Sequence, residues 1–228
     1  MSNYFQIRII LFLSVLTFNS CIDKNATDID PSIIYDAEFS LPLGADTLFM
    51  EQLVQTVTLV EIPPGVDKDT VKYFLYDSVY YYSPGTLSDS ILAPLNLAAF
   101  KNDTAEITSL MFRINAVNLI PAEFLVQLYF ADSNKAILDS LYDDGPFSLD
   151  PAQIDDSGNV IASWGVMKDD YLTPEKIDKL GDMRNVILSS QMIIPDSSTD
   201  TVPPFFHDQY LWIQVGIRVK LKMTIDVF

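Results

Sequence analysis

Cysteine and histidine are almost absent from this chain of 228 residues, which contains one of each. A single cysteine cannot form an intrachain disulfide, and a single histidine excludes a metal site built from several histidines. Basic residues are also scarce, with 14 lysines and arginines against 31 aspartates and glutamates and a formal charge of −17. This balance argues against nucleic-acid binding and against a basic membrane clamp, because both need clusters of lysine and arginine.

Sequence motifs of catalysis are missing as well. The chain contains no Gly-x-Ser-x-Gly elbow, no phosphate-binding Gly-x-x-x-x-Gly-Lys and no dinucleotide fingerprint. A hydrolase triad would have to use His207, which we interpret as a loop residue before the last strand. We therefore predict no catalytic residue, no cofactor and a non-enzymatic protein. A surface enzyme acting on polysaccharide stays open as a hypothesis, because paired carboxylates cannot be chosen among 31 acids without geometry.

Residues 1–20 have the pattern of a secretory signal peptide. Arg8 supplies the positive charge, an apolar run follows over residues 9–16, and Asp23 is the first acidic residue. The run is shorter than the ~20 apolar residues that span a bilayer, and nothing after Cys21 approaches that length. Cys21 therefore stands where a signal peptide would be cut, directly behind the small residue Ser20.

The segment Phe18-Asn19-Ser20-Cys21 resembles the lipobox of bacterial lipoproteins, in a relaxed form like those of the Bacteroidota. The resemblance implies that Cys21 is acylated, with palmitate-type chains, and becomes the mature N-terminus. It also implies a membrane anchor in the cell envelope, at the outer membrane, with the periplasmic and surface faces both open. Several acyl chains give stable attachment where one does not. An ordinary signal peptide that is cut elsewhere is the alternative.

The organisation of the chain follows from this anchor. We expect a lipoprotein signal peptide over residues 1–20, the acylated cysteine and a flexible acidic tether over 21–31, and a single β-rich domain over 32–228. Removal of Arg8 with the signal would leave 13 basic and 31 acidic residues, and a charge of −18.

The body of the chain has the alternation of β-strands. Apolar residues occupy every second position over residues 211–227, which is typical of a strand with one buried and one polar face. Its length suggests a bend near Gly216. Two further alternating segments flank Pro121, which belongs at a joint because it cannot donate in a ladder. The strands expected besides the C-terminal one cover residues 35–41, 73–82, 110–117, 124–130, 137–141, 160–166 and 184–194.

Two short helices are predicted, over residues 46–55 and 173–181. Capping and terminating residue types stand at their ends: Asp46 or Thr47, then Thr173, Pro174 and Gly181. The helices do not alternate with strands, so a parallel sheet is not expected. The predicted fold class is mainly β, an antiparallel β-sandwich or flattened barrel with one or two short helices. Residues 84–101 give no interpretable pattern.

Residues 107–141, with Asn118 and Pro121 between two strands, are similar to the Asn-x-Pro strand pair of LEA14-like domains, which are small β-sandwiches. The segment 39–44, together with the long closing strand, resembles Bacteroidota envelope lipoproteins of unknown function. These resemblances imply an envelope location and a β-rich body. They carry no catalytic residues to this chain.

Three groups of residues are candidate contact sites. The tyrosines of one predicted strand either fill that strand or present a face to a protein or glycan. The basic residues of the last strand either pair with acidic neighbours or bind an anionic group. An acidic turn around Gly158 is read as a turn and, more weakly, as a calcium site, although it lacks EF-hand spacing. The residues are Tyr80, Tyr81 and Tyr82, then Arg218, Lys220 and Lys222, then Asp155, Asp156 and Asn159.

The functional prediction combines these observations. We expect a lipid-anchored, non-enzymatic envelope protein that acts as a binding or scaffold module for a partner protein or a glycan. Its expected partners are the membrane, through the lipid, and an envelope protein or glycan, but not nucleic acid. Two alternatives remain, a carrier of lipid or a small apolar ligand, and a fimbrial-type structural subunit.

Overall fold

The computed structural model describes residues 32–56, 60–67, 71–82, 87–100, 105–194 and 202–226. The predicted signal peptide, Cys21 and the tether lie outside these residues. The chain divides into two compact units, of which the smaller contains residues 32–35 and 224–226 of the described chain and the larger contains residues 36–223. In the smaller unit the side chains of Ile33, Ile34 and Tyr35 are 54–59% exposed. All elements and sites discussed below belong to the larger unit, apart from the ends of its first and last strands.

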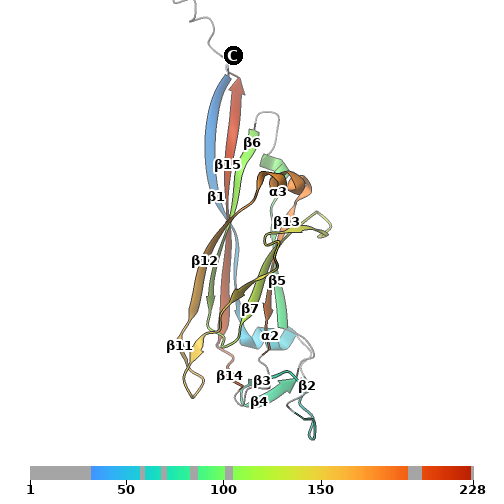
Figure 1. Ribbon diagram of the computed structural model, residues 1–228, viewed down its shortest axis with the longest axis vertical. Helices are drawn as coiled ribbons and strands as arrows, with labels where there is room; N and C mark the ends of the chain where they lie inside the picture. The colour runs from blue at the N-terminus through green and yellow to red at the C-terminus, as the bar shows by residue number, and fades with distance from the viewer. Residues whose placement is uncertain are drawn as a thin grey trace, which may run out of the picture. The chain divides into compact units, whose positions relative to one another are not determined.

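Two antiparallel sheets form the body of this unit (Figure 1). The β6 sheet has the order β1 (Ser32–Phe49), β15 (Tyr210–Asp226), β6 (Ala105–Asn118) and β12 (Trp164–Tyr171). The β7 sheet has the order β5 (Leu87–Pro94), β13 (Asn185–Met192), β7 (Phe124–Ala131) and β8 (Ile137–Ser140), with β9 (Phe147–Leu149) also beside β7. The predicted mainly β fold is confirmed. A β-sandwich fits these sheets, and the described strands do not close into the alternative flattened barrel.

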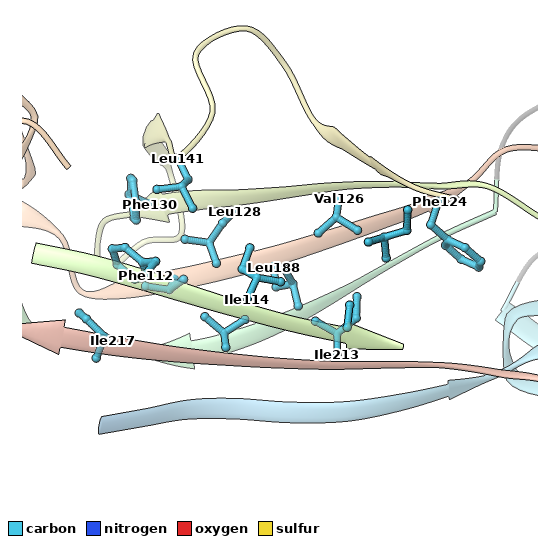
Figure 2. Close-up of a cluster of buried hydrophobic side chains, with 14 of the residues drawn as sticks. Phe112, Ile114, Phe124, Val126, Leu128, Phe130, Leu141, Leu188, Ile213 and Ile217 are labelled. Atoms are coloured by element: carbon cyan, nitrogen blue, oxygen red, sulfur yellow. The ribbon is translucent and has the colours of Figure 1, made fainter. Parts of the chain in front are cut away.

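The hydrophobic core lies between the two sheets. Figure 2 shows side chains of β6 and β15, among them Phe112 and Ile213, pointing toward side chains of β7 and β13, among them Phe130 and Leu188. Phe112 and Phe130 are fully buried, with ring centroids 5.2 Å apart. Along β13 every second residue is buried, as the sequence predicted. Alternation along each strand thus supplies one wall of the core and leaves the opposite face of the β6 sheet outward.

The joint between β6 and β7 confirms the predicted place of Pro121, and Asn118 holds it together. The fully buried Asn118 amide donates from Nδ2 to the carbonyl oxygens of Ala122 (2.8 Å) and Asp150 (2.9 Å). Its Oδ1 accepts from the backbone N–H of Ile120 at 2.9 Å. One side chain therefore satisfies three buried or half-buried backbone groups where the chain leaves the sheet.

The bend expected near Gly216 stays a prediction, because the pairing of the strand shows only that no β-bulge lies there. β15 pairs with β6 in unbroken register through Gly216, and the register shifts only between Lys220 and Leu221. At the shift Thr108 of β6 is the extra residue, and its hydroxyl donates to the Lys220 carbonyl at 3.2 Å. A β-bulge therefore lies six residues before the end of the strand, between Lys220 and Leu221, and not at Gly216.

The predicted strand over residues 73–82 is two strands. β3 (Tyr73–Tyr76) and β4 (Val79–Tyr82) form a hairpin around Asp77 and Ser78, whose φ angles are +46° and +69°. Both central residues of a type I′ turn need positive φ, and the usual glycine signal is missing here. The hairpin belongs to a small sheet of order β14 (Pro204–Phe205), β3, β4 and β2 (Val60–Glu61). The segment predicted as one strand over 160–166 likewise divides, into β11 (Val160–Ala162), which pairs with β10 (Gln153–Ile154), and the start of β12.

The first predicted helix is shorter than expected, because β1 continues through residues 46–49. α2 (Met50–Thr56) begins after Phe49, whose backbone N–H donates to the Gln52 side chain at 3.1 Å, so neither Asp46 nor Thr47 is the cap. In the second helix, α3 (Pro174–Lys179), Thr173 caps as predicted and accepts from the Lys176 N–H at 3.3 Å.

Gly181 does not end the second helix in the way the sequence suggested. The chain continues into the 3-10 helix η4 (Leu180–Asp182), which contains Gly181. The uninterpreted segment 84–101 contains β5 and the 3-10 helix η3 (Leu97–Phe100). β5 lies at the edge of its sheet, where Ser88, Asp89 and Ser90 interrupt any apolar alternation.

Candidate binding face

Arg218 and Lys220 lie on the outer side of β15, and each is paired with Glu38 of the neighbouring strand β1. The Arg218 Nε atom is 3.3 Å from Glu38 Oε1, and the Lys220 Nζ atom is 3.5 Å from Oε2. Lys222 stands opposite Glu106 of β6 in the register. Pairing of these cations with acidic neighbours, the simpler of the two readings, therefore accounts for part of the cluster.

The three candidate tyrosines divide between the two faces of their sheet. Tyr81 is half-buried and stacks on Phe74, with ring centroids 6.0 Å apart. Tyr80 is 38% exposed and packs edge-on against Tyr73 at 5.4 Å, and Tyr82 is half-buried. Tyr81 thus packs beside the core, and the tyrosines lie in a different sheet from the basic residues of β15.

The acidic turn is organised by its own hydrogen bonds. Asp155 Oδ1 accepts from the backbone N–H groups of Ser157 and Asn159, both at 2.9 Å, and Asp155 Oδ2 accepts from Asn159 Nδ2 at 3.0 Å. These bonds, those of Asn159 foremost, lower the pKa of the Asp155 carboxyl. Asp156 is exposed, and no group of three potential metal-ligating side chains occurs in the part of the chain that the structure describes. The turn reading accounts for this geometry, while calcium binding stays an untested prediction.

Two features of the structure require a glycine at position 158 in this turn. Its φ is +86°, and a Cβ atom there would collide with Pro204 and come within 2.6 Å of Phe206 Cε2. The turn therefore packs directly on the segment before β15, where Gln209 donates to the Gly158 carbonyl at 3.4 Å. His207 is exposed in the same segment.

The outer face of the β6 sheet carries a hollow of about 290 Å³. Its wall is formed by residues 40–42 of β1, by Met111, Arg113 and Asn115 of β6, and by Gln214, Gly216 and Arg218 of β15. Gly216 stands opposite Arg113 in the register and contributes no side chain, so its neighbours surround open space. The two charged residues in this wall are both arginines, and the amides of Asn115 and Gln214 stand opposite each other.

Arg113 is held in place by a carboxylate of the edge strand β12. Its Nε and Nη2 atoms donate to the two oxygens of Asp169, each at 2.6 Å. This two-point contact lowers the pKa of Asp169, with a further contribution from Arg218, and raises the pKa of Arg113. Next to the pair, Tyr171 and Met167 of β12 are 63% and 64% exposed. The Arg113 guanidinium is therefore held in a fixed position, with the amides of Asn115 and Gln214 on one side and the exposed Tyr171 ring on the other.

A second hollow of about 260 Å³ adjoins the same strands. It is lined by Thr47, Phe49, Val117, Tyr210 and Trp212, and the rings of Phe49 and Tyr210 are 5.7 Å apart. Between Tyr210 and Arg218 a strand rises about 3.3 Å per residue, so the two hollows extend over about 26 Å of β15. We call this surface, from Tyr210 to Arg218 with its neighbours on β1, β6 and β12, the outer face.

Most residues of the outer face were not predicted. Alternation along residues 211–221 does place Trp212, Gln214 and Gly216 on the polar side with Arg218. It contains no information about which residues of β1, β6 and β12 lie beside them.

One hollow among the described residues between the two sheets bears on the carrier alternative, which stays a hypothesis. The hollow bounded by Leu43, Ile91, Val186, Leu188 and Val215 has a volume of about 10 Å³, room for about one water-sized probe.

No helix in the described part of the chain is long and apolar enough to cross a bilayer.

Comparison with known proteins adds little to this geometry. No protein-family model and no curated protein matches the chain. Among solved structures, a Parabacteroides distasonis protein described as secreted is 13% identical, with 62% of this chain and 41% of that chain covered and a TM-score of 0.37. The chain thus spans about two fifths of the length of that protein.

Two smaller solved domains are covered almost completely. A family 35 carbohydrate-binding module of Clostridium thermocellum is 10% identical over 82% of this chain and 96% of that one, with a TM-score of 0.28. The adhesin domain of Lys-gingipain from Porphyromonas gingivalis is 10% identical over 80% and 99%, with a TM-score of 0.35. Likeness at this level gives no information about function, which has to be inferred from the outer face itself.

Proposed function

We propose that this protein is a lipid-anchored, non-enzymatic module of the cell envelope that binds a glycan or a partner protein through its outer face. The observation that carries the proposal is the pair of adjoining hollows on the solvent side of the β6 sheet. Binding sites combine apolar and aromatic surface with a few polar groups in a concave place. Trp212 and Tyr210 supply the first, and Asn115, Gln214 and Arg218 supply the second.

The carboxylates of the outer face favour binding over glycoside hydrolysis. The general acid of a glycosidase needs a raised pKa, so that it is protonated when the leaving group departs. Asp169 has a lowered pKa because Arg113 donates two hydrogen bonds to it, and Glu38 lies against Arg218 and Lys220. Both carboxylates serve to position cations.

The anchor rests on the sequence around Cys21, which lies outside the described residues. Mass spectrometry of the mature N-terminus tests it directly, and we expect a chain that begins at an acylated Cys21. An unmodified Cys21, or cleavage elsewhere, would remove the anchor from the proposal but leave the outer face unaffected.

Photo-crosslinking in the native host tests the binding role without knowledge of the ligand. A benzophenone amino acid at Met167 on the outer face should give a reproducible adduct. The matched control is Ile161 of β11, which is 66% exposed against 64% for Met167 but does not belong to the outer face. Equal adducts from both positions, or none from Met167, would contradict the proposal.

A further inference from the structure

We infer that the ligand of the outer face is an acidic saccharide, a glycan whose sugar rings carry carboxylate groups, and that Arg218 holds one carboxylate in the larger hollow. This inference rests on the proposed function and specifies the ligand class. It starts from charge: in a chain of formal charge −17, the charged residues in the wall of this hollow are two arginines. Each arginine has a carboxylate partner outside the wall, Asp169 for Arg113 and Glu38 for Arg218, and the wall itself presents guanidinium groups to an anion.

Arg218 has unused hydrogen-bonding capacity in this place. Its Nε atom is buried and has no aligned hydrogen bond within the described structure, although Glu38 Oε1 lies 3.3 Å away. Glu38 also serves Lys220, so one carboxylate is shared by two cations. A buried donor without an acceptor is costly, and a guanidinium gains most from a planar carboxylate. The Arg218 side chain as a whole is 36% exposed, so a ligand carboxylate in the hollow would contact the exposed part of this guanidinium rather than the covered Nε atom.

Arg113 provides a second, fixed cation on the opposite side of Gly216. Its Nε and Nη2 atoms are occupied by Asp169, which leaves the Nη1 atom outside that pair. The Asp169 contact neutralises part of its charge and holds the guanidinium in place. An anion in the hollow would thus meet Arg218 on one side and the prepositioned Arg113 guanidinium on the other.

The rest of the surface favours a saccharide over an acidic peptide. Sugar hydroxyls need both donors and acceptors, which the amides of Asn115 and Gln214 supply, and the apolar face of a sugar ring packs on aromatic rings such as Trp212. An extended peptide binds most simply at a sheet edge, where backbone groups are available. β6 and β15 each have a neighbour on both sides, so the hollow offers side chains rather than backbone.

The test is calorimetric titration of the full mature protein with tetragalacturonic acid and with the same oligomer methyl-esterified at its carboxyl groups. We expect the acid to bind and the ester to bind at least about tenfold more weakly, because a hydrogen bond to a charged group is lost. Arg218→Gln should cause a loss of about tenfold to a hundredfold for the acid. Lys179→Gln on α3 makes the same change in net charge away from the outer face and should leave the affinity unchanged.

The outcomes separate this inference from the proposed function. Equal binding of acid and ester, or equal weakening by Arg218→Gln and Lys179→Gln, would overturn the acidic saccharide and leave a glycan-binding face. Tighter binding of a hexaglutamate peptide than of the saccharide would overturn it in favour of a protein partner. Absence of binding by either oligomer, combined with a Met167 adduct that contains a protein, would overturn the saccharide but support the function. Absence of any Met167 adduct would contradict the function itself.

Discussion

Gly216→Ile should make the protein more stable and at the same time abolish binding. Gly216 lies inside a strand with its φ in the range that other residues adopt, and the nearest atom to an added Cβ is the Leu41 carbonyl oxygen at 3.6 Å, an ordinary contact. Glycine inside a strand costs roughly 0.5–1 kcal/mol, and β-branched residues favour strands. The variant should therefore gain about 0.5–1 kcal/mol, which corresponds to about 1–4 °C in Tm for a chain of this size.

The same side chain would project into the hollow of about 290 Å³ between Arg113 and Arg218. Thermal unfolding measures the gain in stability, and the yield of the Met167 photo-adduct together with the affinity for tetragalacturonic acid measures the loss of binding. We expect at least a tenfold loss, about 1.4 kcal/mol of binding free energy.

Gly165→Ile is the matched control. Gly165 lies on the same side of the β6 sheet in β12, and an added Cβ would meet the Ala116 carbonyl oxygen at 3.7 Å. It does not line the hollow between Arg113 and Arg218, but Val117 beside it, 4.0 Å from the added Cβ, lines the second hollow, so this variant should gain similar stability and lose less binding than Gly216→Ile. Undiminished binding by Gly216→Ile would refute a ligand site at Gly216. A loss of more than about 1 kcal/mol of stability in Gly216→Ile would refute the statement that the Gly216 backbone has a conformation that other residues adopt.

Three further predictions concern the scaffold and the ion pair. Asn118→Ala should lower the free energy of unfolding in urea by about 2–5 kcal/mol, because three backbone groups lose their partner. Gly158→Ala should cost about 1–3 kcal/mol of backbone strain and a similar amount for the collision with Pro204 and Phe206, measured in the same way. The Asp169 carboxyl should titrate below its ordinary value of 3.8 in a carbon-13 NMR experiment. The stability that its contact with Arg113 provides should be fully present above that value and lost as the pH falls through the lower, folded-state pKa.

Each of these predictions has its own control. Asn115→Ala removes a half-buried amide on the outer face and should change stability by no more than about 0.5 kcal/mol. Gly145 has a φ of +101° with nothing within 4 Å of an added Cβ, so Gly145→Ala should show the strain without the collision. Arg113→Gln should return the Asp169 titration toward its ordinary range. An equal cost at both glycines, or an Asp169 titration that Arg113→Gln does not move, would contradict the contacts described.

The fold class was largely predictable because alternation is a local signal. Residues 211–221, the two strands around Pro121 and the alternating face of residues 186–192 all appear where the sequence placed them. The errors arose where a turn or a strand lacks its usual marker. The β3–β4 hairpin turns at Asp77 and Ser78 without a glycine, and β5 has polar residues at the sheet edge.

The candidate site was less predictable because it depends on contacts between distant segments. Arg218 was singled out for its charge, but its neighbours Glu38 and Arg113 are separated from it by more than a hundred residues in sequence. The sequence predicted a bend at Gly216, because a glycine within a strand more often marks a bend or a bulge than a hollow on the sheet surface. Only the register of β15 with β6 shows that Gly216 faces Arg113.

The two tryptophans of the chain allow the most direct test of binding on the outer face. Trp212 lines the second hollow on that face, whereas Trp164 packs against the core from β12. Their indole N–H signals can be followed by NMR while tetragalacturonic acid is added, and the Trp164→Phe variant assigns them. Binding on the outer face predicts a saturable shift of the Trp212 signal with little change at Trp164. A shift confined to Trp164, or no shift of Trp212 at saturating ligand, would contradict it.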